Sequence, residues 1–489
     1  MEPAAPIASG TPQAPGTPRG PVALSLIATS LGTYWFVAFA GSSAVSHALP
    51  GGGASPPYSL VLHPAPLVVV ALLWAATLAG GAGTWLALRA VRGGWTPAPH
   101  ILLAAAAVAT VAFVIVPPVN SDDVYSYAAY GRMAATGRDP YTTTAQDLPA
   151  DPVAREVTKP WRDTPTVYGP IATAEQTLVM RAAGRSVRLG VVGLSALGAL
   201  AFLATAGILD RYAGDAAART RAALCWALNP LLLFQLVGGA HLDTLGILAL
   251  VLAIGLAESS RTAAAGAAIG AAIAVKLTGG IAAIGLAWSL RHEPRRLAQL
   301  VAGGVLIVVP SYLLAGGTTA FGQARKASRF VSFASWWRPI VVALETRMDS
   351  GPARQVVSTL ALLAFLVVAR LLLRVLPPTA PGLERLAGML FAVTLAWLVT
   401  AAYTLPWYAA WAWPLLALMA AGDWDHVLLA WTAALTIAYI PGRDVQLPAG
   451  LAGMTSGLRS AFGPAALLTI LVATIVLAAR TGGSADPAA

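Results

Sequence analysis

The chain has 489 residues, of which 57% are hydrophobic and only 11% are charged. Soluble globular proteins carry about 25% charged residues, so most of this chain is expected to contact lipid rather than water. The net charge of +10 could suggest nucleic-acid binding, but the basic residues fall in short loops between apolar runs, where membrane topology accounts for them. The single cysteine, Cys225, excludes an internal disulfide. The sequence predicts an all-α polytopic membrane protein that binds no nucleic acid.

The two ends of the chain are rich in small residues and proline. Residues 1–20 and 481–489 are expected to be disordered tails, the first of them cytoplasmic. The tripeptide 38–40 resembles a signal-peptidase site at the end of the first apolar run. Only Arg19 supplies the basic region before this run, and many apolar runs follow it. We therefore expect a retained first helix and one membrane domain over residues 21–480.

Apolar runs follow one another along this domain. A spanning helix needs about 20 residues, so several runs are short and one, 262–290, is too long for a single span. That run could be one tilted helix or two short helices hinged at residues 276–280. The runs are 22–40, 67–90, 101–116, 187–208, 222–238, 241–257, 262–290, 297–315, 353–376, 385–403, 405–421, 425–440 and 462–480.

The placement of arginine favours two helices in 262–290. Lys and Arg accumulate in cytoplasmic loops. With a cytoplasmic N-terminus and a hinge at 276–280, the basic residues of the loops named below fall inside, and about 13–14 helices result. The long polar stretch 118–185 then lies outside and is expected to be partly helical. The residues that fall inside are Arg89, Arg92, Arg211, Arg219, Arg221, Arg261, Arg291, Arg295, Arg296, Arg370, Arg374, Arg385 and Arg480.

One loop breaks this rule. Residues 316–352 should lie outside, yet they contain five basic residues. Longer loops obey the charge rule poorly, which is one explanation. The other is that a basic cluster at the outer surface attracts a phosphate or pyrophosphate headgroup. The cluster comprises Arg325, Lys326, Arg329, Arg338 and Arg347.

Several common catalytic signatures are missing from the sequence. It contains no phosphate-binding glycine loop of the P-loop type, no HExxH zinc motif and no Gly-x-Ser-x-Gly motif. Cysteines and histidines do not cluster, so no structural metal site is predicted. A cytosolic nucleotide-dependent enzyme is poorly supported, and the remaining chemistry rests on carboxylates, aromatic residues and cations near the outer face.

Two adjacent carboxylates, Asp122 and Asp123, directly follow the apolar run 101–116. Such groups at a membrane boundary are costly without partners or a function. If the segment is a helix, Asp123, Tyr127 and Tyr130 share one face. The carboxylates could simply favour the helix N-terminus. Alternatively, one of them is a general base that takes a proton from an acceptor hydroxyl.

Further candidates lie at other predicted outer boundaries. Tyr168 belongs to a Tyr-Gly-Pro turn. His241 and Asp243 could form a mutually satisfied pair that braces two helices, or they could hold a ligand or metal. Lys276 could extend to the membrane surface or contact a phosphate. The aromatic-rich segment 404–414 suits an interfacial belt, a lipid- or sugar-lining wall, or both.

Taken together, these motifs resemble the GT-C glycosyltransferases, which are polytopic enzymes that use polyprenyl-phosphate sugars. They are most similar to the polyprenol-phosphomannose-dependent α-1,6-mannosyltransferases of actinobacterial envelopes, which build the mannan core of lipomannan and lipoarabinomannan. The resemblance covers about residues 20–480, and the order of the motifs carries it. The motifs are Asp-x-Tyr-Ser-Tyr at 123–127, Gly-x-Asp-Pro-Tyr at 137–141, Tyr-Gly-Pro at 168–170, Asn-Pro at 229–230 with His-x-Asp at 241–243, Lys276, and Pro-Trp-Tyr at 406–408.

The resemblance implies a role for each of the two carboxylates. The family's first outer loop usually reads Ser-Arg-Asp-Val-Tyr-Ser-Tyr, and here residues 121–127 read Ser-Asp-Asp-Val-Tyr-Ser-Tyr. Asp123 therefore matches the family's essential acid, and Asp122 replaces a residue that is often basic. Asp123 ranks first as the base and Asp122 second. The pair could also share a proton, or engage a divalent cation such as Mg²⁺ or Mn²⁺, although no cofactor is required.

The implied reaction is direct displacement with inversion. An acceptor mannose hydroxyl attacks β-linked polyprenyl phosphomannose, Asp123 removes the proton, and polyprenyl phosphate departs. The implied partners are the donor, a mannoside or lipomannan acceptor and the plasma-membrane bilayer, with a monomeric enzyme whose site faces outward in loop 118–185. The candidate substrate-binding residues are Tyr125, Tyr127, Arg132, Tyr168, His241, Asp243, Lys276, Arg325, Lys326, Arg329, Trp407 and Tyr408.

Two other functions remain open from the sequence. A GT-C transferase for another polyprenyl-phosphate sugar, such as arabinofuranose, would share these motifs, because sugar choice depends on pocket shape. A lipid-linked sugar transporter or flippase is the rival from another class. Transporters often show internal repeats and mid-membrane charges, whereas here no clear repeat is visible and the notable charges gather at one surface.

Overall fold

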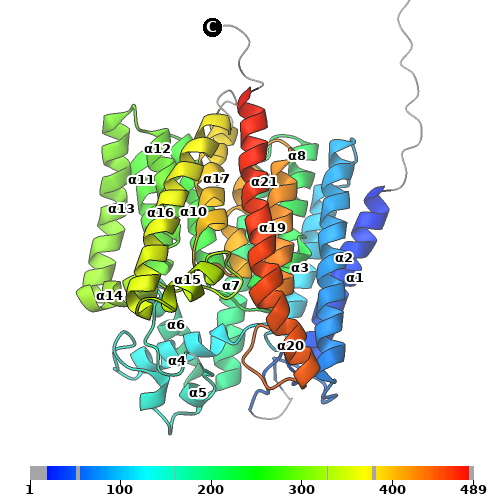
Figure 1. Cartoon of the computed structure of the whole chain (residues 1–489), viewed down its shortest axis with the longest axis vertical. Helices are drawn as coiled ribbons and strands as arrows, with labels where there is room; N and C mark the ends of the chain where they lie inside the picture. The colour runs from blue at the N-terminus through cyan, green and yellow to red at the C-terminus, as the bar shows by residue number, and fades with distance from the viewer. Residues whose placement is uncertain (1–18, 51–54, 160, 328, 377–381, 484–489) are drawn as a thin grey trace, which may run out of the picture.

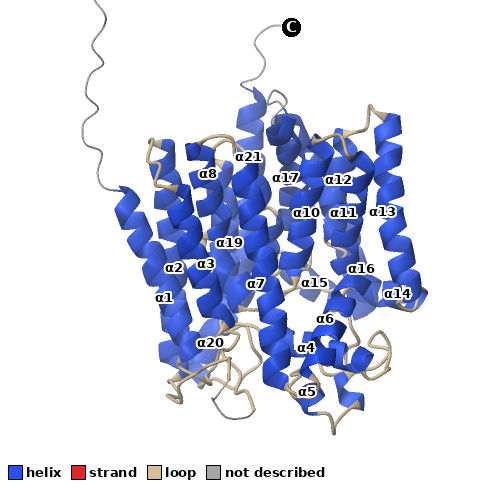
Figure 2. Ribbon diagram, turned by 180° about the vertical axis from the view of Figure 1, so that it is seen from behind, coloured by secondary structure: helices blue, strands red, loops and turns tan. Residues whose placement is uncertain are grey.

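The computed structural model describes residues 19–50, 55–159, 161–327, 329–376 and 382–483. Residues 1–18 and 484–489, which make up most of the two predicted tails, lie outside these ranges. The described chain is helical apart from loops and one isolated bridge between Ser46 and Val119, as Figures 1 and 2 show. The predicted all-α polytopic architecture is confirmed.

Eight helical segments among the described residues are long and apolar enough to cross a membrane. Proline at the first helical position starts α2 and α13, where its missing N–H leaves no hydrogen bond unmade. The eight segments are α1 (Arg19–Phe39), α2 (Pro66–Arg92), α7 (Val187–Tyr212), Ala216–Gly238, α13 (Pro294–Leu314), α16 (Ser350–Val375), α17 (Gly382–Thr400) and Ala449–Thr481.

Two of these segments are built from several pieces. The segment Ala216–Gly238 comprises α8 (Ala216–Ala222), the π-helix η2 (Ala223–Ala227), α9 (Pro230–Leu232) and the π-helix η3 (Leu233–Gly238). The last comprises α20 (Ala449–Gly457), the π-helix η5 (Leu458–Phe462) and α21 (Gly463–Gly483). Asn229 caps α9 by accepting from the N–H groups of Leu231 and Leu232, which explains the Asn-Pro motif locally.

Shorter helices fill the space between these segments. The predicted total of about 13–14 crossings is reached only if the shorter helices of the bundle also cross. Those in the bundle are α3 (Pro99–Val114), α10 (Asp243–Glu258), α11 (Thr262–Val275), α12 (Gly279–Ser289) and α19 (Trp424–Tyr439). Those outside it are α4 (Asp123–Ala135), η1 (Ala145–Asp147), α5 (Pro152–Arg155), α6 (Pro170–Ala183), α14 (Thr318–Ala327) and α15 (Arg338–Glu345).

The bundle has two different ends (Figure 1). One end carries α4, α5 and α6, which form a layer from the polar stretch 118–185. The other end carries the C-terminal ends of α2, α7 and α16, whose last turns contain arginines predicted to face the cytoplasm. Arg221 also lies at this end. It was expected in an exposed loop, but it is buried and forms an ion pair with Asp425 at 2.7 Å. The arginines in the last turns of these three helices therefore share the end of the bundle opposite the α4 layer.

The run 262–290 folds as two helices that reverse direction at residues 276–278. A Cβ on Gly266 would lie 2.0 Å from the carbonyl oxygen of Leu300, and one on Gly270 would lie 2.8 Å from that of Gly304. Helices α11 and α13 therefore run in the same direction at close contact, and α12 between them must run back. This hairpin, α11–α12, is the hinged arrangement that the arginine pattern favoured.

The run 405–421 does not form the continuous helix that its apolar composition suggested. It forms the 3-10 helix η4 (Pro406–Trp411) and the short α18 (Trp413–Ala417). Pro414 lacks an N–H and interrupts the helix. The segment is buried throughout these two helices, and irregular backbone is tolerated at membrane depth where protein surrounds it.

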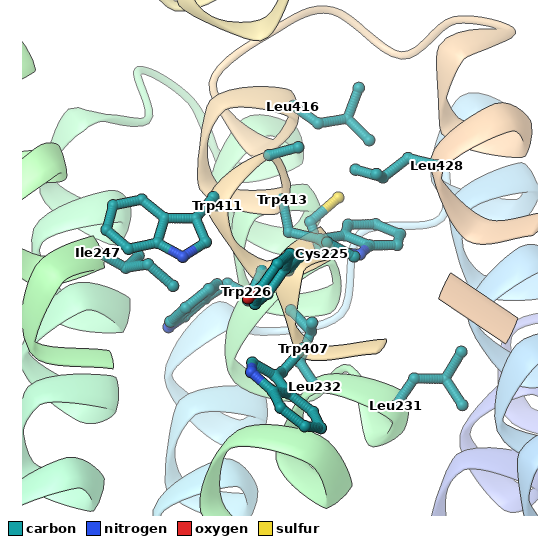
Figure 3. Packing of buried hydrophobic residues seen from close by; sticks show 14 of the residues in the cluster. Cys225, Trp226, Leu231, Leu232, Ile247, Trp407, Trp411, Trp413, Leu416 and Leu428 are labelled. Carbon is teal, nitrogen blue, oxygen red and sulfur yellow. The ribbon is translucent and has the colours of Figure 1, made fainter. Parts of the chain in front are cut away.

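Four tryptophans pack at the centre of the bundle around this segment, as Figure 3 shows: Trp226, Trp407, Trp411 and Trp413. The indole N–H of Trp226 donates to the carbonyl of Phe202 at 3.0 Å, and that of Trp413 to Thr432 at 3.1 Å. Buried tryptophans normally require such partners. Because Trp411 and Trp413 are fully buried, an interfacial belt is the wrong explanation for this part of the motif.

Candidate active site

The chain enters the α4 layer through a turn that fixes Asp123. The Val119 N–H donates to the carbonyl of Gly238, and the Asn120 N–H donates to that of Val45. Asn120 adopts the left-handed conformation, with φ of 65°, which asparagine tolerates. Ser121 Oγ then accepts from the backbone N–H of Asp123, the first residue of α4. The carboxylate is thus held at the junction between the bundle and the layer.

Two side chains approach the Asp123 carboxylate. Tyr127, one helical turn later, donates its hydroxyl to Oδ2 at 3.4 Å, so the predicted shared face is confirmed for this pair. His241 Nδ1 lies 3.6 Å from the same oxygen, and its ring stacks on Trp407 with centroids 3.7 Å apart. Tyr130 turns to the carbonyl of Thr164 instead.

His241 and Asp243 take different partners rather than each other. His241 faces Asp123, whereas both oxygens of Asp243 lie 3.0 Å from Lys276 Nζ. The indole N–H of Trp411 donates to Asp243 Oδ1 at 2.8 Å. The mutually satisfied pair considered from the sequence is therefore not formed. Each residue instead ties the start of α10 to a separate element.

Lys276 sits at the tip of the α11–α12 hairpin, against the Tyr-Gly-Pro turn. The Gly169 N–H donates to the carbonyl of Val275, and a Cβ on Gly169 would lie 2.1 Å from the carbonyl oxygen of Ala274. Only glycine permits this approach of two backbones. As a result Lys276 Nζ lies 6.0 Å from the centre of the Tyr168 ring and 4.5 Å from that of Tyr408.

These groups surround a cavity of about 390 Å³ where the α4 layer meets the bundle. Its polar end carries Asp123 and Lys276. Its other walls are mostly apolar or aromatic and come from the hairpin, α16, α17, α19, the segment 401–408 and the segments that carry Trp161 and Phe330. Of the predicted binding residues, Tyr168, Lys276, Trp407 and Tyr408 line this cavity.

Burial shifts the proton affinity of the groups at the polar end. It raises the pKa of Asp123 to about 6, although the positive charge of Lys276 opposes the shift. Burial likewise raises the pKa of Tyr127 and Tyr168 well above the usual value, so both hydroxyls stay protonated. Burial and Lys276 hold the pKa of His241 well below its usual range. The site therefore contains a neutral histidine beside a carboxyl group that titrates near neutrality.

Asp122 has a partner that the sequence reasoning missed. Arg443 Nε lies 2.6 Å from Asp122 Oδ1, and both side chains are more than nine-tenths buried. Thr158 donates to the other oxygen at 3.3 Å. A signal was present, because Arg443 is a basic residue in a loop expected outside, where the charge rule disfavours it. Asp122, which the sequence ranked second as the base, is therefore held in an ion pair with Arg443.

The other predicted binding residues lie elsewhere. Tyr125 is buried against His47, with ring centroids 4.7 Å apart. Arg132 pairs with Asp151 at 3.0 Å and joins α4 to α5. Arg325 on α14 and Arg329 just after it are exposed and do not line the cavity, although Phe330, which follows Arg329, does. The side chain of Lys326 lies outside the described residues.

The residues do not form a set suited to a divalent cation. Mg²⁺ and Mn²⁺ prefer several converging oxygen ligands. Arg443 pairs with Asp122, and Lys276 pairs with Asp243, so among the described residues only Asp123 presents a carboxylate to the cavity. Within the described ranges, no three acidic, histidine or cysteine side chains gather in a metal-binding arrangement.

Comparison with known proteins identifies related sequences. The family model described as alpha-(1->6)-mannopyranosyltransferase, N-terminal domain, matches residues 29–292. Alpha-(1->6)-mannopyranosyltransferase A of Corynebacterium glutamicum is 30% identical over 234 residues, which are 46% of this chain and 47% of that protein. Alpha-(1->6)-mannopyranosyltransferase B of the same organism is 26% identical over 378 residues, 69% of this chain and 62% of that protein.

A mycobacterial relative shows the same pattern. Alpha-(1->6)-mannopyranosyltransferase A of Mycobacterium tuberculosis is 35% identical over 184 residues, which are 37% of this chain and 35% of that protein. The chain thus spans between about a third and three fifths of the length of these curated relatives.

Proposed function

Because the chain belongs to the alpha-(1->6)-mannopyranosyltransferase family, whose model matches more than half of it, we propose that it transfers mannose from a polyprenyl-phosphate-mannose donor to a mannan acceptor. The product is an α-1,6 linkage. The observation that carries the proposal is the cavity itself, because a carboxyl group and an ammonium group line a space whose other walls are mostly apolar or aromatic. A lipid-linked phosphosugar has the same division between a polar head and an apolar tail.

The reaction proceeds in one displacement. The acceptor hydroxyl oxygen forms a bond to the anomeric carbon of β-linked mannose, and the bond from that carbon to the phosphate oxygen breaks. The hydroxyl proton passes to Asp123, and polyprenyl phosphate leaves with the bonding electrons. Attack from the opposite face inverts the β-linkage to an α-linkage.

Asp123 suits the role of general base. A base works best when its pKa lies near the working pH, and burial brings the pKa of Asp123 to about 6. Most molecules therefore carry an unprotonated Asp123 at neutral pH. Tyr127 orients the carboxylate through its hydrogen bond, and the neutral His241 leaves its charge uncompensated on that side.

Lys276 is the cation placed to meet the donor phosphate. Its ammonium group has three N–H donors, and two of them serve the oxygens of Asp243. The third can donate to a phosphate oxygen in the cavity, which stabilises the charge that develops on the leaving group. Arg325, Lys326 and Arg329 would act earlier, by attracting the headgroup from the membrane surface.

The walls beyond the polar end match a lipid tail. Ala361, Leu362 and Phe365 on α16 line the cavity, and Leu362 is also 57% exposed on the outside of the bundle. In a membrane this exposed side contacts lipid. A polyprenyl chain can therefore enter the cavity laterally along α16 without leaving the bilayer.

The active site faces the extracytoplasmic side in this proposal. The support is that the last turns of α2, α7 and α16, which carry arginines expected in the cytoplasm, lie at the end of the bundle opposite the α4 layer. Cysteine labelling tests the orientation. In a Cys225→Ser background, an exposed cysteine at Ala150 in the layer should react with an impermeant reagent in intact cells, whereas one at Ser259 should not. Reaction at Ser259 alone would reverse the topology.

A transfer assay tests the function. Purified protein is supplied with polyprenyl-phosphate-mannose and a short α-1,6-mannoside, and the linkage formed is determined. We expect an added α-1,6-mannose, and we expect Asp123→Asn to slow its formation by roughly 10²–10⁴-fold. Transfer from polyprenyl-phosphate-arabinofuranose but not from the mannose donor would replace the proposed sugar. Movement of the donor across liposomes without transfer would indicate a flippase.

A further inference from the structure

Asp122 and Asp123 are neighbours in sequence with opposite environments. Asp122 is paired with Arg443 at 2.6 Å and accepts from Thr158, so both of its oxygens are engaged. Asp123 lines the cavity, and the described residues place no arginine or lysine within ion-pair distance of it. The negative charge of Asp122 still acts on Asp123 and favours its protonated form.

Arg443 is itself held by groups from other segments. It donates to the carbonyl of Ser43 at 3.1 Å and to His47 Nδ1 at 2.8 Å. Arginine can only donate, so Nδ1 must accept and the proton of the neutral ring sits on Nε2. His47 Nε2 then donates to Glu156 at 2.7 Å. The guanidinium therefore occupies one fixed place rather than a range of rotamers.

A backbone contact delivers Arg443 to this place. Gly442 precedes it in the loop after α19, with φ of 33°. A Cβ on Gly442 would lie 1.9 Å from the carbonyl oxygen of Asn120, so the backbones of the two loops are in close contact. Asn120 lies two residues before Asp122. This contact between distant parts of the chain puts the guanidinium beside Asp122.

We propose that Arg443 is a positioning residue that separates the roles of the two carboxylates, by neutralising Asp122 and so leaving Asp123 as the one that accepts the acceptor's proton. This inference rests on the proposed function and adds to the proposed site a residue that lies far away in the sequence.

The charges around Asp123 show why neutralising Asp122 matters for the pKa of Asp123. Besides Asp122, several charged or titratable groups face Asp123. They are Lys276 at the hairpin tip, Asp243 at the start of α10, His241 just before α10, and several tyrosines. Negative charge on Asp122 or Asp243 raises the pKa of Asp123, and Lys276 lowers it. Lys276 already compensates Asp243. Without Arg443, the charge of Asp122 would have no such compensation. The tyrosines are Tyr127, Tyr130, Tyr168, Tyr403, Tyr408 and Tyr439.

The test is the pH profile of kcat/KM for Arg443→Gln and for the double variant Asp122→Asn/Arg443→Gln. In the single variant the acidic limb should move up by roughly one pH unit, which is roughly a tenfold loss of rate on that limb. The double variant should return the limb to its wild-type position, because both charges are gone. Arg443→Lys should shift it less than Arg443→Gln, because the charge remains.

A purely structural role gives a different result. Arg443→Gln would then lower activity by the same factor at every pH, and the double variant would be no better than the single one; that outcome overturns the inference. Arg188→Gln is the matched control, because Arg188 also joins two outer segments, through the carbonyls of Ser55 and Pro57, but leaves no carboxylate behind. Its acidic limb should stay in place.

A second measurement needs no substrate. The Tm of the wild type minus that of Asp123→Asn, followed from about pH 4 to about pH 9, reports the titration of Asp123 alone. In an Arg443→Gln background this difference should change at higher pH than in the wild type. If transfer of mannose is never observed, the proposed function fails but this comparison still decides the role of Arg443. An unmoved titration would refute the inference while the proposed function stands.

Discussion

Lys276 Nζ lies 3.0 Å from both carboxylate oxygens of Asp243, at the tip of the α11–α12 hairpin. Asp243 is completely buried, and the indole N–H of Trp411 donates to the same carboxylate. The pair therefore joins three elements that lie far apart in sequence. It also fixes a cation in the wall of the cavity, at the position proposed to meet the donor phosphate.

Replacing Lys276 with methionine should destabilise the protein by about 3–5 kcal/mol, because a buried carboxylate is left without its partner. The double variant Asp243→Asn/Lys276→Met should recover much of this stability. It should not recover transfer, because the proposed phosphate contact is still missing. Thermal unfolding in detergent and the transfer assay measure the two effects separately. Recovery of transfer in the double variant would show that Lys276 acts only as a structural brace.

Replacing Asp123 with asparagine should reduce kcat by roughly 10²–10⁴-fold, the range usual for loss of a general base. The side chain keeps its shape, and burial no longer acts on a charge, so the Tm at neutral pH should not fall. Donor binding, measured with the labelled donor and no acceptor, should change little. Near-normal transfer by Asp123→Asn would contradict the assignment of the base.

The pH dependence follows from the raised pKa of Asp123. The base must be unprotonated, so kcat/KM should rise with pH through about 6 and level off above about 7. The stability effect has the opposite sign. Below the ordinary pKa of 3.8 the group is neutral in both states, and stability falls as pH rises through about 6, because the folded state holds the proton more tightly. Activity and Tm, measured over the same pH series, should diverge in this window.

Blocking the apolar wall of the cavity should affect long donors most. Ala361→Trp places a large ring in the cavity from α16, and we expect KM for a full-length polyprenyl donor to rise about tenfold, which is about 1.4 kcal/mol. A donor with a short, water-soluble prenyl chain should be affected less. Leu363→Trp is the control, because Leu363 is 53% exposed on the same helix and does not line the cavity. Equal effects of the two variants would argue against lateral entry along α16.

Neutralising Arg325, Lys326 and Arg329 together should weaken capture of the donor from the membrane. Each basic residue near an anionic surface contributes about 1 kcal/mol, and the effect should shrink at high salt. We expect a raised KM for the donor with kcat nearly unchanged. A salt-independent loss of kcat would instead place these residues in the chemical step.

The sequence determined the membrane character of this protein. Only 11% of its 489 residues are charged, which is too few for a soluble protein, so most of the chain must contact lipid. It also determined the hairpin at 276–280. Arginine placement is set by the membrane potential and the insertion machinery, and so it is readable without a fold. The pair Asp123 and Tyr127 could be predicted for a similar reason, since residues one helical turn apart meet through local geometry alone.

The tertiary structure decided the partners of the charged residues. Asp122 and Arg443 are 321 positions apart and meet only because two loops touch at Gly442 and Asn120. Asp243 pairs with Lys276 and Trp411 rather than with His241, its neighbour in sequence, and no local pattern predicts these partners. Electrostatic interactions act through space, and in an apolar interior each charge is stabilised by whichever partner the packing brings near. The sequence could therefore name candidate groups, and only the fold could assign a partner to each of them.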